Sequence, residues 1–199
     1  MKTVIFIEGG AKASRDMKIR CQQAFHKLLA KMELPKGRSP GLIACGSRND
    51  VYDRFCIELN SRNGSFAAMW IDSEKPVSDP ENPWEHLRQN DKWQQPDGVV
   101  DDQVLLMTTC METWIVADRE SLRTHYGRKL QESALPPLHE LERRAPHDLA
   151  ERLTHATRNC SNAFSKGKRS FEILATLSIA ALEPLPSFAR ILRILKTRL

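Results

Sequence analysis

The sequence has no apolar run long enough to cross a membrane, because one helical span needs about 20 consecutive apolar residues. Its first apolar run, Val4 to Ile7, is short and is followed at once by the acid Glu8. That pattern does not match a secretory signal peptide. We therefore expect a cytoplasmic protein with no membrane partner.

Several motifs of well-known enzyme classes are also missing. The five cysteines are scattered and form no CxxC pair, so neither a zinc ribbon nor a disulfide framework is supported. We expect reduced and mostly buried thiols. The patterns GxxxxGK(S/T), GxGxxG and HExxH are absent. Their absence argues against an intrinsic P-loop ATPase, a Rossmann dehydrogenase and a zincin-type metalloprotease.

Positive charge is unevenly distributed along the 199 residues, whose formal net charge is +5. Residues 1–122 carry 16 Lys and Arg against 18 Asp and Glu, whereas residues 123–199 carry 14 against 7. An acidic front half and a basic back half suit a protein that holds cations in one place and a polyanion in another. A solvated basic surface is the alternative interpretation.

Apolar segments alternate with helical patterns through the front half of the chain. The expected buried strands are TVIFIE, GLIACG, SFAAMWID and QVLLMTT, at residues 3–8, 41–46, 65–72 and 103–109. Helices are expected over residues 17–32, 49–60 (capped by Ser47) and 111–127. This alternation predicts an α/β fold with a mostly parallel four-stranded sheet and helices on both faces.

The rest of the chain is predicted to be an irregular loop and a set of helices. Residues 75–102 are expected to form a long loop with a short helix at 84–89. Helices are expected over 147–160 and 169–182, and residues 187–199 form an amphipathic pattern. We expect an α/β core at residues 1–127 and a basic helical extension at 128–199 packed on it. The amphipathic end either docks on a partner protein or packs on its own domain.

Acids stand where two of the predicted strands end. Glu8 closes the first strand, Asp72 closes the third, and Glu74 follows two residues later, on the same side if the exit is extended. The carboxyl ends of parallel strands meet at one sheet edge, and a hard divalent cation relieves the repulsion between carboxylates there. Gly9 and Gly10 would let a phosphate or the next loop approach the backbone. Glu8 facing only a helix N-terminus is the alternative.

VIFIEGG followed some sixty residues later by MWIDSE resembles the motif pair of the Toprim fold of topoisomerases, bacterial primases and several nucleases. The resemblance implies a general acid/base role for Glu8 and metal binding by Asp72 and Glu74. Glu74 departs from the family pattern, which has an aspartate at that position. The implied cofactor is Mg²⁺ or Mn²⁺.

The whole chain is similar to a small bacterial Toprim-related group of unknown function found beside ATPases in defence-type gene clusters. TTCMETWIVAD and KGKRSFEIL carry this second resemblance and bring in Glu112, Trp114, Lys166 and Gly167. Trp114 is expected in the core, whereas Glu112 is either a fourth carboxylate of the site or a helix acid favoured by the dipole.

Basic residues surround Gly167 at the start of a predicted helix. Lys166, Lys168 and Arg169 there suit phosphate binding, with a solvated charged loop as the alternative. Together these residues predict a metal-dependent nuclease that acts on DNA or RNA, with a possible ATPase partner. The alternative is a non-catalytic Toprim-like module that binds an ATPase.

Overall fold

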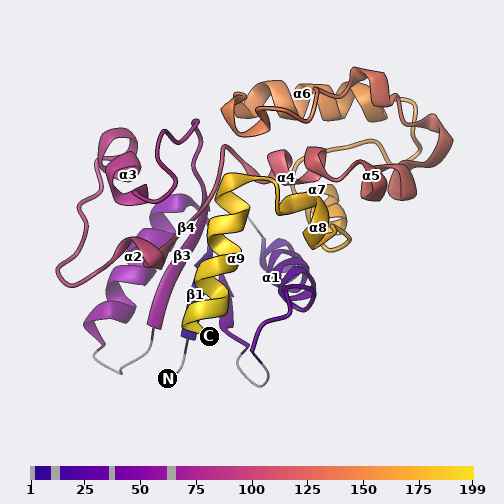
Figure 1. Ribbon diagram of the computed structural model, residues 1–199. Helices are drawn as coiled ribbons and strands as arrows, with labels where there is room; N and C mark the ends of the chain where they lie inside the picture. Colours follow the sequence, from indigo (N-terminus) through magenta and orange to yellow (C-terminus); the bar gives the residue numbers. More distant parts are fainter. Residues whose placement is uncertain (1–2, 10–13, 36–38, 62–65) are drawn as a thin grey trace.

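A four-stranded parallel sheet forms the centre of the computed structural model, which describes residues 3–9, 14–35, 39–61 and 66–199 (Figure 1). The strands are β1 (Thr3–Ile7), β2 (Gly41–Ala44), β3 (Phe66–Asp72) and β4 (Val104–Met107), in the order β2-β1-β3-β4. Every pair of neighbours is parallel. The α/β fold with a parallel sheet is therefore confirmed.

Helices cover both faces of this sheet. They are α1 (Arg15–Leu29), α2 (Arg48–Asn60), α3 (Pro83–Asp91), α4 (Met111–Ala117), α5 (Arg119–Tyr126), α6 (Pro146–Thr157), α7 (Lys168–Leu174), α8 (Ile179–Leu182) and α9 (Pro186–Arg198). One face packs against α2 and α3, and the other packs against α1, α4 and α9 (Figure 1). No helix in the described ranges is long and apolar enough to cross a membrane.

Serine side chains fix where the first two helices begin. Ser14 accepts a hydrogen bond from the Met17 backbone amide at 3.3 Å. Ser47 forms a capping box with Asp50, as the predicted cap at Ser47 requires. The two helices are the next elements after β1 and β2, so each begins beyond the carboxyl end of a strand, which is where ligand sites form in such sheets.

The segment at residues 75–102 contains α3, so the short helix predicted at 84–89 is confirmed. Unlike the expected irregular loop, the segment buries Trp84, Leu87, Trp93 and Val99 against the sheet face that α2 also covers. Trp93 stacks on Tyr52 of α2 with ring centroids 4.5 Å apart. The sequence did not predict this packing because polar residues and a proline separate the apolar residues of the segment, which show no continuous helical or strand period across it.

The helix predicted at residues 111–127 is two helices that break at Asp118. The Asp118 carboxylate is buried and accepts hydrogen bonds from the backbone amides of Ser121 (2.9 Å) and Ser178 (2.7 Å). Asp is a good helix cap and a poor interior residue, so it starts α5 here. The helix expected at 169–182 is likewise broken into α7 and α8, where the Lys31 ammonium donates to the Ala175 and Leu177 carbonyls, each at 2.9 Å.

The C-terminal helix α9 packs on its own domain, which was one of the two expectations for it. Its apolar residues Phe188, Ile191, Leu192, Leu195 and Leu199 are all buried. Arg190 is also buried and donates to the carbonyls of Val104 and Asp101, each at 2.8 Å. The apolar face of α9 is therefore occupied by this chain and is not open to a partner.

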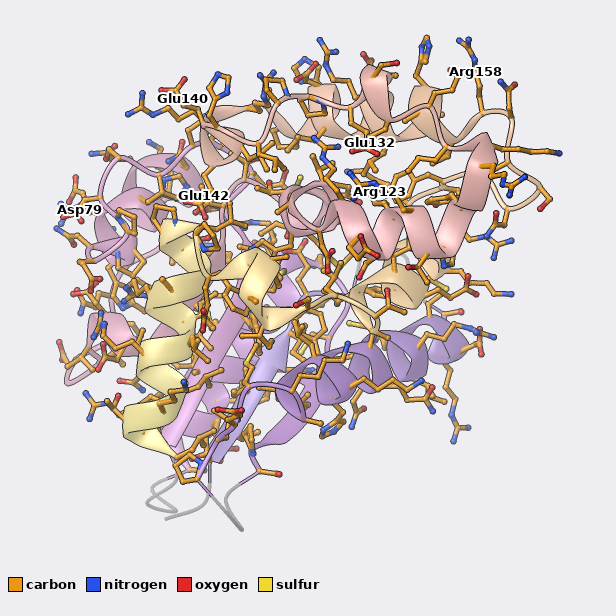
Figure 2. The ribbon with its side chains drawn as sticks, turned by 45° about the vertical axis from the view of Figure 1, so that its right-hand side comes forward. Asp79, Arg123, Glu132, Glu140, Glu142 and Arg158 are labelled. Carbon is orange, nitrogen blue, oxygen red and sulfur yellow. The ribbon has the colours of Figure 1, made fainter. Side chains whose placement is uncertain are left out.

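Polar contacts hold the segment between α5 and α9. Arg123 and Glu132 point toward one another and form an ion pair of 2.7 Å (Figure 2). The Glu142 carboxylate accepts a hydrogen bond from the Ser187 backbone amide at 3.1 Å, which satisfies a donor at the start of α9. The larger of the two apolar clusters includes residues from the sheet, α1, α4, α6, α7 and α9.

The cysteines are free thiols, as expected. Cys21, Cys45, Cys110 and Cys160 are buried and Cys56 is partly exposed. Trp114 is fully buried as well, so its predicted place in the core is confirmed.

Candidate functional site

Three neighbouring strands bring acids to one edge of the sheet. β1 ends just before Glu8, β3 ends on Asp72, and Glu112 lies in the first turn of α4 after β4. In the sheet register Ile7 pairs with Trp70 and Asp72 pairs with Met107, so the three strand ends are nearly level. The acids therefore converge because the strands are parallel and adjacent.

A cavity of about 210 Å³ lies at this edge and is called the carboxylate pocket below. It is lined by Glu8, Gly9, Asp72, Glu74, Met107, Met111, Glu112, Lys166, Gly167, Ser170 and Phe171. All four carboxylates predicted to bind metal line the pocket, and so do Gly9, Lys166 and Gly167. Residues more than 150 positions apart in the chain thus share one cavity.

Hydrogen bonds position these carboxylates. The Asp72 backbone amide donates to Glu8 Oε2 at 3.4 Å, and the Met111 amide donates to Asp72 Oδ1 at 2.9 Å. Glu112 is almost fully buried and accepts a hydrogen bond from Ser170 Oγ at 3.3 Å. Lys166 Nζ lies 3.9 Å from Glu112 Oε2, so a cation from the loop before α7 faces the acids.

The chain leaves β3 in a different way from that expected. Glu74 has a φ of 61°, so the exit is a turn and not an extended segment. Two backbone bonds hold the turn: the Ser73 amide donates to the Met107 carbonyl and the Glu74 amide donates to the Thr109 carbonyl. A left-handed conformation is unfavourable for glutamate, and such strain concentrates at functional sites. Glu74 lines the pocket because of this turn.

Burial and repulsion from neighbouring carboxylates raise the pKa values of Glu8 and Asp72. Burial is the main cause that raises the pKa of Glu8 to about 7, with Glu74 adding to it and Arg48 opposing it. Burial, followed by repulsion from Glu8, Glu112 and Glu74, raises the pKa of Asp72 well above its usual range. Arg48 itself is held by Asp91 at 2.8 Å. The raised pKa values mean that ionising Glu8 and Asp72 costs free energy in the pocket, a cost that a bound cation would offset.

This donor set fits a hard divalent cation. Its four carboxylates offer oxygen ligands, the type that Mg²⁺ and Mn²⁺ prefer. Within the described ranges, no group of three or more His, Cys, Asp or Glu side chains is close enough together to hold a metal ion. Mg²⁺ is commonly bound through one or two carboxylates, several waters and substrate phosphates, which is the mode that this pocket suits.

Two of the predicted phosphate-binding residues lie elsewhere. Arg169 pairs with Glu172 at 2.8 Å, and Lys168 faces a separate groove between α1 and α7. Gly10 lies outside the described residues. Sequence reasoning missed Ser170 and Arg48. The signal for Ser170 is its place three residues after Gly167, on the first turn of a helix, whereas no local signal pointed to Arg48.

A family model described as a domain of unknown function (DUF4276) matches residues 10–196. The chain belongs to the DUF4276 family. The matched region of the DUF4276 model includes Asp72, Glu74, Glu112 and Lys166 and begins just after Gly9. No curated protein and no solved structure matches the chain.

Gly9 lets two loops of this DUF4276 protein approach closely. A Cβ atom at Gly9 would lie 2.7 Å from the Cys45 carbonyl oxygen, and the Gly9 amide donates to the Gly46 carbonyl at 3.3 Å. Gly9→Ala is therefore expected to lower the free energy of unfolding by about 2 kcal/mol, because the backbone at Cys45 must move to make room for the new Cβ atom. Urea denaturation measures this.

The matched control for that change is Gly41→Ala in β2. A Cβ there would make an ordinary contact of 3.6 Å with the Thr3 carbonyl oxygen. We expect a change of less than about 0.5 kcal/mol for this variant. Equal effects of the two substitutions would show that the close approach at Gly9 does not matter.

The raised pKa of Glu8 predicts that the folding stability of the DUF4276 protein depends on pH. Ionised Glu8 destabilises the fold, and this cost grows as pH rises from about 4.5, where the unfolded chain ionises, to about 7. Glu8→Gln is expected to raise the free energy of unfolding by about 2 kcal/mol near pH 8 and by less than about 1 kcal/mol near pH 5. Denaturant titrations in EDTA at both pH values measure this, and a destabilised variant at both would contradict it.

Proposed function

We propose that this DUF4276 protein is a divalent-metal-dependent nuclease that hydrolyses phosphodiester bonds in DNA or RNA. The observation that carries the proposal is the convergence of Glu8, Asp72, Glu74 and Glu112 in one cavity with Lys166 at its rim. Carboxyl groups with raised pKa values in a cavity, here Glu8 and Asp72, are typical of a catalytic site. The resemblance of VIFIEGG and MWIDSE to the Toprim motif pair also supports it.

Each residue has a role that follows from its place in the pocket. Asp72 and Glu74 would hold Mg²⁺ or Mn²⁺ together with water and a substrate phosphate, and Glu112, bonded to Ser170, would lie next to them. The bound ion supplies charge neutralisation and an activated water molecule. Glu8, whose pKa is about 7, can accept or donate a proton near neutral pH and serves as general acid/base. Lys166 would hold a phosphate oxygen.

Strand cleavage is favoured over topoisomerase chemistry. The latter needs a nucleophilic tyrosine close to the metal, and the sequence has only Tyr52 and Tyr126. The Tyr52 hydroxyl donates to the Gln94 carbonyl at 2.7 Å, and Tyr126 is buried at the end of α5. Neither residue lines the carboxylate pocket.

The cellular setting follows from the resemblance to the Toprim-related group. It suggests a cytoplasmic component of a bacterial defence-type system that works with a partner ATPase. A non-catalytic ATPase-binding module was the alternative, and its expected docking surface was the apolar face of α9. Because that face is buried in this chain, the nuclease is the proposal we favour.

Cleavage assays test the proposal directly. Supercoiled plasmid, labelled single-stranded DNA and labelled single-stranded RNA are incubated with the protein in Mg²⁺, Mn²⁺ or EDTA. We expect at least one substrate to be cut with metal and none to be cut in EDTA. Failure of well-folded protein to cut any substrate in either metal would contradict an autonomous nuclease.

A further inference from the structure

The carboxylate pocket cannot by itself attract a polyanion. Among the described residues, four acids line it and Lys166 is the one cation. Binding of nucleic acid depends on Lys and Arg side chains that neutralise phosphates. If the substrate is a nucleic acid, most of its binding energy must come from a neighbouring surface.

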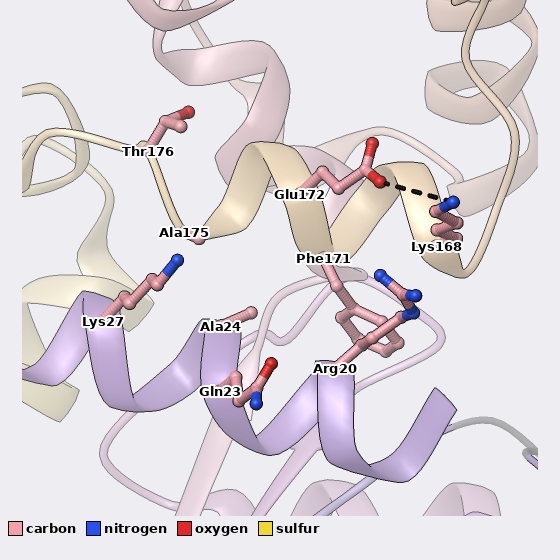
Figure 3. Close-up of a pocket in the computed structure, with 9 residues that line it drawn as sticks. All are labelled: Arg20, Gln23, Ala24, Lys27, Lys168, Phe171, Glu172, Ala175 and Thr176. Carbon is pink, nitrogen blue, oxygen red and sulfur yellow. Dashed lines mark ion pairs between the residues drawn. The ribbon is translucent and has the colours of Figure 1, made fainter. Parts of the chain in front are cut away.

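A basic groove lies beside the pocket, between α1 and α7 (Figure 3). This α1–α7 groove has a volume of about 260 Å³. It is lined by Arg20, Gln23, Ala24, Lys27, Lys168, Phe171, Glu172, Ala175 and Thr176. Figure 3 shows Arg20 and Lys27 reaching from α1 toward α7, with Lys168 at the start of α7 on the opposite wall.

The groove and the carboxylate pocket adjoin at the beginning of α7. Phe171 lines both cavities. Gly167 faces the pocket, whereas the next residue, Lys168, faces the groove. A nucleic-acid strand that follows the groove therefore reaches the carboxylates by passing over the Gly167–Lys168 turn.

The cations of the groove are available to a ligand. Lys27 is exposed and forms no ion pair within the described part of the chain. Arg20 pairs with the exposed Asp16 at 2.7 Å, and exposed pairs of this kind contribute little. Lys168 lies 4.0 Å from Glu172, an acid already held by Arg169 at 2.8 Å.

Helical spacing sets these charges along a line. Arg20 and Lys27 are seven residues apart, so they lie on the same side of α1 about 10 Å from each other along its axis. Gln23 stands between them and adds an amide to the same wall. Ala24, Phe171 and Ala175 form the apolar part of the lining. Thr176 and Glu172 complete it, and the charge of Glu172 is paired with Arg169 at 2.8 Å.

We propose that the α1–α7 groove binds the phosphate backbone of a single strand of nucleic acid beside the bond that is cut. A single strand is favoured because the path bends at the Gly167–Lys168 turn, and duplex DNA resists bending over short distances. This inference rests on the proposed function in one respect, namely that the adjoining carboxylate pocket cuts the bound strand. Binding to the groove itself is measured without metal and without cleavage.

The test is fluorescence anisotropy of a labelled single-stranded oligonucleotide in EDTA over a range of salt concentrations. The groove variant carries Arg20→Gln, Lys27→Gln and Lys168→Gln. Its affinity is expected to fall at least about tenfold at 0.1 M salt, and its salt slope to become shallower by about 2, since each phosphate contact on a single strand contributes about 0.7.

Two variants control for charge and for folding. Arg54→Gln, Lys129→Gln and Lys196→Gln remove the same charge from exposed positions outside the groove, and are expected to bind like the wild type. Arg20→Lys, Lys27→Arg and Lys168→Arg keep the groove charge and are expected to retain the affinity. Thermal melts verify that each variant is folded.

The outcomes separate this inference from the proposed nuclease. Asp72→Asn is expected to retain oligonucleotide binding in EDTA even though it loses cleavage. If metal-dependent cutting occurs while the groove variant binds with unchanged affinity and salt slope, the groove inference fails and the nuclease stands. If the groove variant loses binding but no substrate is ever cut, the groove stands and the nuclease fails. Tighter binding to duplex of the same sequence, or equal competition by polyglutamate, would also overturn the inference.

Discussion

Asp72→Asn is expected to reduce metal-dependent cleavage about a thousandfold or more, which corresponds to about 4 kcal/mol of transition-state stabilisation. Asp72 is the last residue of β3 and lies between Glu8 and Glu112 at the base of the carboxylate pocket. Asparagine keeps the oxygen that accepts the Met111 amide, so the fold is preserved while the negative charge is lost. Initial rates of cleavage in Mn²⁺ measure the effect.

The control for this change is Asp53→Asn on α2. Asp53 is exposed and does not line the pocket, so Asp53→Asn is expected to cleave at the wild-type rate. Cleavage by Asp72→Asn at more than about a tenth of the wild-type rate would remove Asp72 from the proposed mechanism.

Trp114→Ala is expected to lower the free energy of unfolding by about 3–5 kcal/mol. The Trp114 ring lies 6.0 Å from Trp70 of β3 and 5.1 Å from Phe188 of α9, with edge-to-face geometry in both pairs. Trp70 in turn packs on Phe25 of α1 at 4.8 Å. The loss of one ring would therefore open a cavity where the sheet and three helices meet. Urea denaturation measures the change.

Trp114→Phe keeps an aromatic ring but reduces the side-chain volume, so it separates the effect of the smaller volume from the effect of losing the ring. The buried indole Nε1 of Trp114 has no hydrogen-bond partner among the described residues, so phenylalanine removes no polar contact. We expect a cost of about 1–2 kcal/mol. A cost for Trp114→Ala that is no greater than that for Trp114→Phe would contradict the aromatic packing described above.

The strand ends were the part of the site that the sequence predicted best. Short apolar runs that stop at Glu8 and Asp72 predict two strands with an acid at the carboxyl end of each, and neighbouring parallel strands bring such ends together. The sequence left two roles open for Glu112, a ligand of the site or a helix acid, because the helix dipole alone also favours an acid in the first turn. Its burial and its contact with Ser170 depend on α7, which lies about sixty residues away in the sequence.

The features that the sequence did not predict all depend on tertiary contacts. Asp118 breaks a continuous helical pattern because its carboxylate accepts the Ser178 amide, a contact across 60 residues. Lys168 and Arg169 are only two and three residues beyond Lys166, yet the turn at Gly167, with a φ of 95°, directs them away from the pocket. Periodicity describes which residues share a face and does not describe which distant segment covers it.

Calorimetric titration of Mn²⁺ into the wild-type protein and Asp72→Asn, near pH 8 where Glu8 is ionised, tests the carboxylate pocket most directly. We predict saturable binding by the wild-type protein and none by the folded variant. Binding should also weaken as pH falls below about 7, because protons then compete for Glu8. Absence of Mn²⁺ binding by folded wild-type protein, or equal binding by Asp72→Asn, would contradict a metal site at the ends of β1, β3 and β4.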